Sequence, residues 1–547
     1  MNTSLRRVFS ILAATLLAAG LFAGCQSGAP ATSSAPVQTS ASAQQTEAPT
    51  PEPVEKITLT KLTASNPDLD TLTGGDYNKT PSAIELEKRT GVHIEHIMTT
   101  GQDYDTRMNL LIASGEMPDL FSLPGNYPGS YTKAAEDGVI VKINDYWDKL
   151  APNLKRVAES KPEWLKSLKA DNGDVYAFPV FREDKSITVF FGPLIRKDLL
   201  DAAGLAVPET IDEWHTALTA FKNAGVKNPF TSMNWFITYS GAFVGAFGAT
   251  DAGDPGSIVP GQDGKMHYGP TQAGYKQYLE TFHQWYQEGL IDPDFPTLTD
   301  WGVLATKVTS GEAGSALFFL SGANEWTAAG QQTNPAFELV GAKYPVVNKG
   351  DQPLYGQCDP PLKLLYSISA KSQHIERAIS YLDYGYSEEG QMFFNFGIQD
   401  ESYTLDAEGN PVYTELITAT PKNSKGWTQA QALLMYCPAA SDYATIQRKS
   451  YFEQIRLTTD RAKNCVALWS ESTLPSIPPN LSLTKAETMV TKKRVDIDTY
   501  VQEMAARFIM GTEPLSNWDQ YVERCKQLGV EDVVEVYNDA LTRFNNR

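Results

Sequence analysis

The chain has 547 residues, of which 42% are apolar and 20% charged, and its formal net charge is −19. These proportions are those of an ordinary globular protein, and the length favours two domains over one. The negative charge argues against a nucleic-acid ligand and against an electrostatic contact with a membrane, because phosphate-rich surfaces attract Lys and Arg.

The first 25 residues have the features of an export signal. Two arginines, Arg6 and Arg7, precede an apolar or small run at residues 8–21, and Cys25 follows Ala23 and Gly24. That run is shorter than the about 20 apolar residues needed to cross a bilayer. Its end resembles the lipobox of bacterial lipoproteins, which implies that residues 1–24 are a signal peptide and that a lipid on Cys25 anchors the protein to the outer face of the cell membrane. An ordinary secretory signal with an incidental cysteine is the alternative.

Residues 25–55 form the next segment and consist almost wholly of Ser, Ala, Thr, Gln, Pro and Gly. A segment with so few large apolar side chains cannot offset the entropy lost on ordering, so we predict a disordered linker. A flexible coil of this length has a root-mean-square reach of roughly 30 Å. The folded body is therefore expected a short distance from the membrane.

The body from residue 56 onward alternates between strand and helix patterns, which is typical of α/β layers. The patterns predict strands at 56–62 and 92–98, helices at 82–89 and 108–114, and a short buried strand near residue 120. A loop broken by glycine and proline then follows at residues 125–130. It lies at the carboxyl end of a strand, the edge where open α/β sheets place their ligands.

Helix signals are clearest in the later part of the chain. Thr210 and Glu213 have the spacing of a capping box, and Trp214, Leu218 and Phe221 then form one apolar stripe. Similar stripes predict further helices at residues 275–288 and 375–382. The region 496–544 predicts two or three helices, broken at 511–514 and at Gly529.

Metal and disulfide signals are weak. His93 and His96 lie in one predicted strand at an odd spacing, so they point to opposite faces and cannot share a metal. Residues 171–174 (Asp-Asn-Gly-Asp) fit a hairpin turn better than a calcium loop, whose remaining ligands are missing. We therefore expect no metal and no cofactor.

Four cysteines follow the leader, without any CxxC spacing: Cys358, Cys437, Cys465 and Cys525. Export permits a disulfide bond. Isolated cysteines are nevertheless more often buried apolar fillers, which is the interpretation we favour.

A set of short motifs follows in a fixed order along the body. They lie at residues 115–119, 175–179, 195–205, 378–390, 508–511, 514–516 and 518–521. Together they resemble family 1 extracellular solute-binding proteins, the receptors of carbohydrate ABC importers, and in particular the long lipoprotein subgroup of that family. None of the motifs is catalytic.

The resemblance implies a two-lobed α/β fold of the periplasmic-binding-protein type (type II), with hinged lobes and a ligand cleft between them. Lobe 1 is expected at 56–182 and 353–400, and lobe 2 at 183–352 and 401–547. The implied function is capture of a carbohydrate, an oligosaccharide in our interpretation, and its delivery to the permease subunits of an ABC importer. The implied protein is not an enzyme, acts as a monomer, and contacts the membrane only through its lipid anchor.

Sugar sites need aromatic platforms edged by polar side chains, because pyranose C–H faces stack on rings and hydroxyls need hydrogen-bond partners. Five tryptophans lie outside the clear helical stripes: Trp235, Trp301, Trp326, Trp427 and Trp469. Trp326 is the preferred platform because it follows the apolar run 317–320 and a Ser-Gly segment, an arrangement similar to the stacking element of maltose receptors. Trp235 and Trp469 match the approximate positions of two further platforms. Each of these tryptophans could instead serve packing.

Polar candidates come from the predicted lobe 1 and from the hinge where the chain leaves it. Asn126 and Tyr127 lie in the loop after the strand near residue 120, and Arg182 and Glu183 lie at the expected first hinge crossing. Tyr355, Gln357 and Asp359 lie where the chain should re-enter lobe 1. The guanidinium of Arg182 would suit a uronate carboxylate. Each could instead form a salt bridge or cap a loop.

Two alternatives remain open at this point. A surface-anchored polysaccharide-degrading enzyme would need two flanking carboxylates, and the pairs Asp292 with Asp294 and Glu388 with Glu389 are unpersuasive candidates. No GxSxG or HExxH motif is present. A receptor or sensor for a non-sugar solute on the same scaffold is the second alternative.

Overall fold

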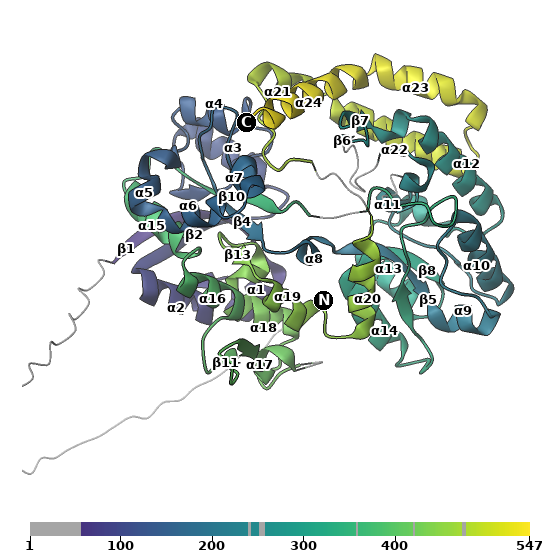
Figure 1. Cartoon of the computed structure of the whole chain (residues 1–547), viewed down its shortest axis with the longest axis horizontal. Helices are drawn as coiled ribbons and strands as arrows, with labels where there is room; N and C mark the ends of the chain where they lie inside the picture. Colours follow the sequence, from purple (N-terminus) through teal and green to yellow (C-terminus); the bar gives the residue numbers. More distant parts are fainter. Residues whose placement is uncertain (1–55, 239–241, 251–257, 357–358, 420–421, 473–476) are drawn as a thin grey trace, which may run out of the picture. The chain divides into compact units, whose positions relative to one another are not determined.

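Two separate β-sheets organise the chain in the computed structural model (Figure 1). The structure describes residues 56–238, 242–250, 258–356, 359–419, 422–472 and 477–547. The expectations for Cys25, Gln357 and Cys358 lie outside these ranges.

The first sheet has six strands in the order β13-β4-β10-β3-β1-β2. Its strands are β1 (Ile57–Ala64), β2 (Val92–Thr99), β3 (Leu120–Phe121), β4 (Phe178–Arg182), β10 (Leu362–Ile368) and β13 (Ile446–Gln447). Only β10 runs against its neighbours in this sheet. The carboxyl ends of the other five strands therefore meet at one edge.

Both faces of the first sheet are covered. Leu59 and Leu62 stand at an odd spacing on β1, so they point to opposite faces, and they belong to two different buried clusters. The helices of this part of the chain are α1 (Pro67–Thr73), α2 (Pro81–Thr90), α3 (Tyr104–Ser114), α4 (Ser130–Glu136), α5 (Trp147–Leu150), α6 (Pro152–Glu159), α7 (Pro162–Leu168), α15 (Ile375–Tyr384) and α16 (Glu388–Phe396). The strands and helices predicted for residues 56–121 are confirmed.

The second sheet has three antiparallel strands in the order β8-β5-β9. They are β5 (Phe191–Arg196), β8 (Ser315–Phe319) and β9 (Leu339–Gly341). Its helices are α9 (Lys197–Ala203), α10 (Ile211–Asn223), α11 (Asn234–Thr238), α12 (Ala273–Gln287), α13 (Trp301–Thr309), α14 (Leu320–Gly330) and α20 (Asp460–Trp469). The predicted capping box of α10 is present, and Trp214, Leu218 and Phe221 are buried as its apolar stripe.

We call the part around the first sheet the first lobe and the part around the second sheet the second lobe. Connections between the lobes include residues 183–190 with α8 (Lys185–Thr188), the described residues of 342–356 and 359–361, and residues 448–459 with α19 (Lys449–Arg456). The first crossing begins where β4 ends, at Arg182. Residues 401–547 were expected in the second lobe, but β13 pairs with β4 and so joins the first sheet. The hairpin of β11 (Tyr403–Leu405) and β12 (Pro411–Tyr413), α17 (Glu415–Thr418) and α18 (Gln429–Tyr436) precede that strand.

The predicted C-terminal helices are confirmed, and their end is bound to the first lobe. They are α22 (Arg494–Met510), α23 (Trp518–Gln527) and α24 (Val530–Asn545), and a further helix, α21 (Lys485–Thr491), precedes them. The last helix, α24, packs on β7 (Met266–Tyr268), which pairs with β6 (Ile258–Pro260). Lys166 Nζ on α7 donates to the Asn545 carbonyl at 3.2 Å, so the C-terminus lies beside the end of this helix. There Asp171 Oδ2 lies 3.1 Å from Arg543 Nε, and Asp171 Oδ1 lies 2.6 Å from Arg547 Nη2. We call these three residues the C-terminal clamp.

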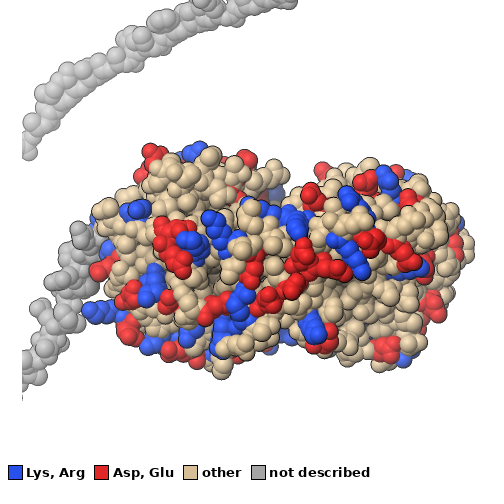
Figure 2. Space-filling model, turned by 90° about the horizontal axis from the view of Figure 1, so that it is seen from above, with Lys and Arg blue, Asp and Glu red and all other residues tan. Residues whose placement is uncertain are grey.

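Charged side chains of both signs are intermixed on the face shown in Figure 2. No continuous basic stripe, of the kind that follows a nucleic-acid backbone, crosses that face. Among the described residues, no helix combines the length and apolar character needed to span a membrane.

Candidate functional site

The carboxyl edge of the first sheet carries an ion pair between a buried arginine and a partly exposed aspartate. Arg182, the last residue of β4, is buried, and its Nη2 lies 3.0 Å from Asp359 Oδ2 while its Nη1 donates to the Pro360 carbonyl at 2.9 Å. Asp442 lies 3.8 Å from the same guanidinium. Burial raises the pKa of Asp359, and Arg182 opposes this rise. The structure thus brings together two predicted site residues, but it also occupies the guanidinium that we considered for a uronate.

The other predicted polar residues of the first lobe lie around the same edge. Glu183 accepts hydrogen bonds from Arg448 Nη1 at 3.0 Å and from the Lys449 N–H at 2.7 Å, so it joins β4 to α19. Asn126 is exposed in the loop after β3, and Tyr127 donates to Asp137 at 2.9 Å. Asn126 is therefore the predicted polar residue that this edge leaves most open to solvent.

The second sheet presents aromatic rings at the edge where the chain arrives from the first lobe. Phe319 at the end of β8 pairs with Phe191 at the start of β5, immediately after the first crossing. Around this edge five rings retain solvent exposure, and we call them the aromatic surface: Phe190, Trp235, Trp301, Phe318 and Phe319. Trp301 lies at their centre, with its ring centroid 5.7 Å from Trp235, 5.5 Å from Phe318 and 5.3 Å from Phe319. Its exposed fraction is 37%, which leaves part of the indole free to contact a ligand.

Trp326 does not occupy the position that the sequence indicated. The Ser-Gly segment that precedes Trp326 belongs to the helix α14. Trp326 is 6% exposed and stacks on Phe318 at 3.8 Å between centroids, so it supports the aromatic surface from behind. Phe318 and Phe319 were not among the predicted site residues, and a pair of aromatics at the very end of a strand is the signal that could have indicated their exposure.

Trp235, Trp469 and Tyr355 have different surroundings. Trp235 belongs to the aromatic surface. Trp469 is 1% exposed, and its indole N–H donates to the Ala342 carbonyl at 3.0 Å. Tyr355 is buried against Gly245 of the second lobe and has a positive φ of 57°. Trp469 and Tyr355 therefore have the contacts of packing residues, and the site proposed below does not include them.

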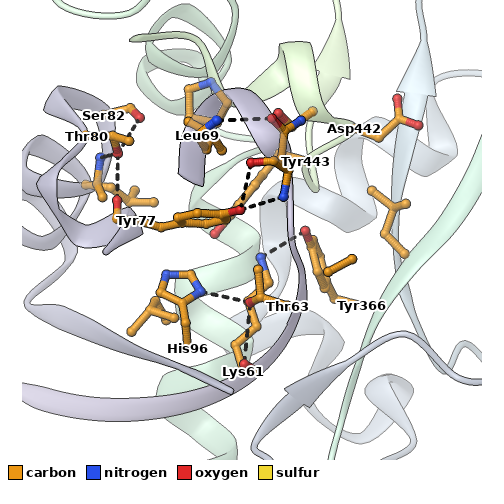
Figure 3. Close-up of a pocket in the computed structure, with 18 of the residues that line it drawn as sticks. Lys61, Thr63, Leu69, Tyr77, Thr80, Ser82, His96, Tyr366, Asp442 and Tyr443 are labelled. Carbon is orange, nitrogen blue, oxygen red and sulfur yellow. Dashed lines mark hydrogen bonds between the residues drawn. The ribbon is translucent and has the colours of Figure 1, made fainter. Parts of the chain in front are cut away.

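A cavity of about 740 Å³ lies in the first lobe between the sheet and the helices α1, α2 and α18 (Figure 3). Lys61, Tyr77, His96, Tyr366 and Tyr443 are among its lining residues. The cavity also reaches residues 65–66 and 122, which follow the carboxyl ends of β1 and β3. It therefore adjoins the edge that carries the polar site residues.

The turn at residues 171–174 is held by protein groups. Gly173 has a φ of 83°, and the Ala170 N–H donates to the Asp174 carbonyl at 2.8 Å, as in the predicted turn. Arginines of the C-terminal clamp bind Asp171, and Asn172 donates to Asp174 Oδ2 at 3.1 Å. In the described part of the chain, no group of three or more His, Cys, Asp or Glu side chains could hold a metal ion.

Two further predictions concern cysteines and paired carboxylates. Cys437, Cys465 and Cys525 are free and buried, as expected for apolar fillers. Asp292 and Asp294 both bind the ammonium of Lys307, at 2.8 and 3.0 Å. Two carboxylates that share one lysine form a structural arrangement, unlike the separated acid and base of a glycosidase.

Two hinged α/β lobes, with polar and aromatic edges joined by the crossing segments, define a two-lobed solute-binding protein. The family model described as "Bacterial extracellular solute-binding protein" matches residues 74–392, which is more than half of the chain. The chain belongs to this family, as the motif order predicted. The family consists of binding proteins of ABC importers rather than enzymes, which removes the degradative alternative.

Relatives match along most of their length. The fructooligosaccharide ABC transporter substrate-binding protein FusA of Streptococcus pneumoniae is 27% identical over 509 residues, covering 88% of this chain and 89% of that protein. The alginate-binding protein AlgQ2, solved without calcium ion, is 21% identical with a TM-score of 0.70 and covers 89% of this chain and 98% of its own. A solute-binding protein for HMO from Bifidobacterium longum infantis is 19% identical with a TM-score of 0.72, at 89% and 99% coverage. These structural likenesses show the two-lobed fold.

Proposed function

We propose that this protein is a lipid-anchored, extracytoplasmic receptor that captures an oligosaccharide and delivers it to the permease of an ABC importer. Family membership supports the transport role. The names of relatives support the ligand class, since FusA is named for fructooligosaccharide and MelE of Bacillus subtilis for melibiose, raffinose and stachyose.

The aromatic surface is the observation that carries the proposal. Its rings follow one another at 5.3 to 5.9 Å between centroids, from Trp235 through Trp301 and Phe319 to Phe190. Sugar rings present C–H faces that pack on such flat apolar surfaces, while their hydroxyls need polar partners at the rim. A row of adjoining rings suits several linked sugar units better than a single small solute.

The two lobes supply complementary halves of the proposed site. The second lobe offers the aromatic surface, and the first lobe offers Asn126 and the polar groups around Arg182 and Asp359. A ligand that touches both lobes stabilises the closed arrangement, because only there are all contacts made. The permease is expected to recognise this closed form.

Calorimetric titration with a panel of oligosaccharides tests the proposal. Trp301→Ala should weaken binding at least tenfold, because removing a central aromatic contact typically costs about 2 kcal/mol. Trp147→Ala is the matched control, since Trp147 is a partly buried tryptophan on α5 of the first lobe. Equal affinities of the two variants would remove the aromatic surface from the site, and heat-silent titrations with every sugar would refute a carbohydrate ligand.

The proposed anchor is tested separately. Cells given labelled palmitate should incorporate the label into the wild-type protein. The Cys25→Ser variant should carry no label and should be released into the medium. Membrane retention of the Cys25→Ser variant would contradict the proposed lipidation site.

A further inference from the structure

The cavity of the first lobe contains a lysine without an acidic partner. Lys61 Nζ donates to Tyr366 Oη at 3.1 Å and lies 4.4 and 4.9 Å from the ring centroids of Tyr366 and Tyr443 (Figure 3). Among the described residues, no carboxylate oxygen lies within 4.0 Å of this ammonium. The neighbouring lining lysine, Lys363, differs because it pairs with Asp442 at 3.2 Å.

Two carboxylates, Glu87 and Asp442, line the cavity, but each has another partner. Glu87 Oε2 lies 2.8 Å from His93 Nδ1. His96 Nδ1 forms a hydrogen bond with the Thr63 hydroxyl at 2.8 Å. Burial, together with the charge of Lys61, lowers the pKa of His96 to about 4, so its ring is neutral at physiological pH. Asp442 is already shared between Lys363 and Arg182. Tyrosine rings attract the ammonium but do not neutralise it.

Lys61 nevertheless remains a cation. Burial disfavours its charge, but Tyr366 and Tyr443 outweigh this effect and leave the pKa of Lys61 above its ordinary value. Lys61 is partly buried, and an ammonium that is partly withdrawn from water without a counter-ion is unfavourable unless another group compensates it. An anionic ligand group would provide that compensation.

The chemistry of the cavity narrows the ligand class. One ammonium matches one negative charge, whereas a phosphate dianion favours several donors or the fork of an arginine. Tyr77, Tyr366 and Tyr443 add flat ring surfaces and hydroxyls, which suit the faces and rim of a sugar ring. The volume of about 740 Å³ is that of a small-ligand pocket.

We propose that this cavity binds a carboxylate-bearing sugar unit at the end of the captured oligosaccharide, with Lys61 as its counter-charge. This inference rests on the proposed function, because it names the class of oligosaccharide. The unit enters from residues 65–66 and 122, where the cavity meets the carboxyl edge of the first sheet. Arg182 is not the recognising cation, since Asp359 already occupies it.

The experiment compares each acidic oligosaccharide with its neutral methyl ester. Oligosaccharides that end in galacturonate, glucuronate, mannuronate or guluronate are titrated against the mature wild-type protein, Lys61→Met and Lys88→Met. Lys88 is the control because it lies on α2 of the same lobe with a side chain 74% exposed. Its replacement makes the same change in net charge without touching the cavity.

The expected result is that at least one acid binds the wild type tenfold or more tightly than its ester, with the preference reduced by added salt. Lys61→Met should abolish this preference and leave the affinity for the ester within twofold, while Lys88→Met should keep the preference. The melting temperature of ligand-free Lys61→Met should not fall, because the variant removes an uncompensated cation.

Two outcomes overturn the inference. One is a wild-type protein that binds esters and neutral oligosaccharides as tightly as every acid, which leaves the proposed function intact. The other is a preference for the acid that survives in Lys61→Met. Failure of all sugars, acidic and neutral, would instead refute the proposed function itself.

Discussion

Replacing Arg547 by Ala tests whether the C-terminal clamp stabilises the protein. Arg547 Nε and Nη2 lie 2.8 and 2.6 Å from Asp171 Oδ1, and Nη2 lies 2.7 Å from the Asn480 carbonyl. The Arg547 side chain is 5% exposed and that of Asp171 26%. Breaking a buried ion pair costs about 3–5 kcal/mol, and breaking an exposed one at most about 1 kcal/mol. Because Asp171 keeps Arg543 and some solvent, we expect a loss of about 2 kcal/mol in the free energy of unfolding.

A double-mutant cycle measures this loss. Urea unfolding of the wild type, Arg547→Ala, Asp171→Ala and the double variant should give an interaction free energy of about 1–2 kcal/mol. Arg507→Ala is the control, since Arg507 pairs with Glu503 on the exposed side of α22 and should change stability by no more than about 0.5 kcal/mol. If Arg547→Ala costs no more than Arg507→Ala, or if the two clamp substitutions act additively, the reasoning is refuted.

Three other expectations concern stability. Burial, aided by the charge of Lys61, lowers the pKa of His96 from 6.5 to about 4, so the unfolded chain binds a proton first as the pH falls. Up to about 3 kcal/mol of the free energy of unfolding, fully present above pH 6.5, should be lost as the pH falls toward 4. The melting temperature of His96→Gln should therefore depend less on pH than that of the wild type. Trp326→Ala should cost about 3–5 kcal/mol in chemical unfolding, because the indole is buried and stacked, and a loss below 1 kcal/mol would contradict that placement. Gly192→Ala should cost about 1–3 kcal/mol, since its Cβ would lie 2.3 Å from the Trp469 ring, and an unchanged near-ultraviolet spectrum and stability would disprove the contact.

Local signals account for the elements that could be predicted from the sequence. The capping box of Thr210 and Glu213 fixes the start of α10 within one turn of chain, and both of its hydrogen bonds are present. Gly322 shows where such signals fail. It suggests a connection after β8, yet it lies inside α14, because a Cβ there would lie 2.5 Å from the Phe318 ring. The sequence alone does not distinguish a glycine needed for close packing from a glycine needed for a turn.

Of the proposed site, the proximity of Arg182 and Asp359 could be predicted from the sequence. Strand ends of an α/β sheet meet at one edge, so the chain positions of Arg182 and Asp359 were sufficient to place them near each other. The aromatic surface depends on which rings the rest of the fold leaves uncovered. Neither the exposure of Trp301 nor the absence of a carboxylate beside Lys61 follows from local patterns, because both depend on contacts between distant segments.

The strand order of the first sheet also sets the sequence of events during folding. The second sheet draws all its strands from residues 191–341, a single stretch of chain. The first sheet needs strands from both ends of that stretch, since β10 and β13 flank β4 but are synthesised long after it. Contacts between such distant segments form slowly. The first lobe, whose first strands emerge earliest during export, should therefore complete its folding last. Its strands stay unpaired until then, and misfolding would begin there.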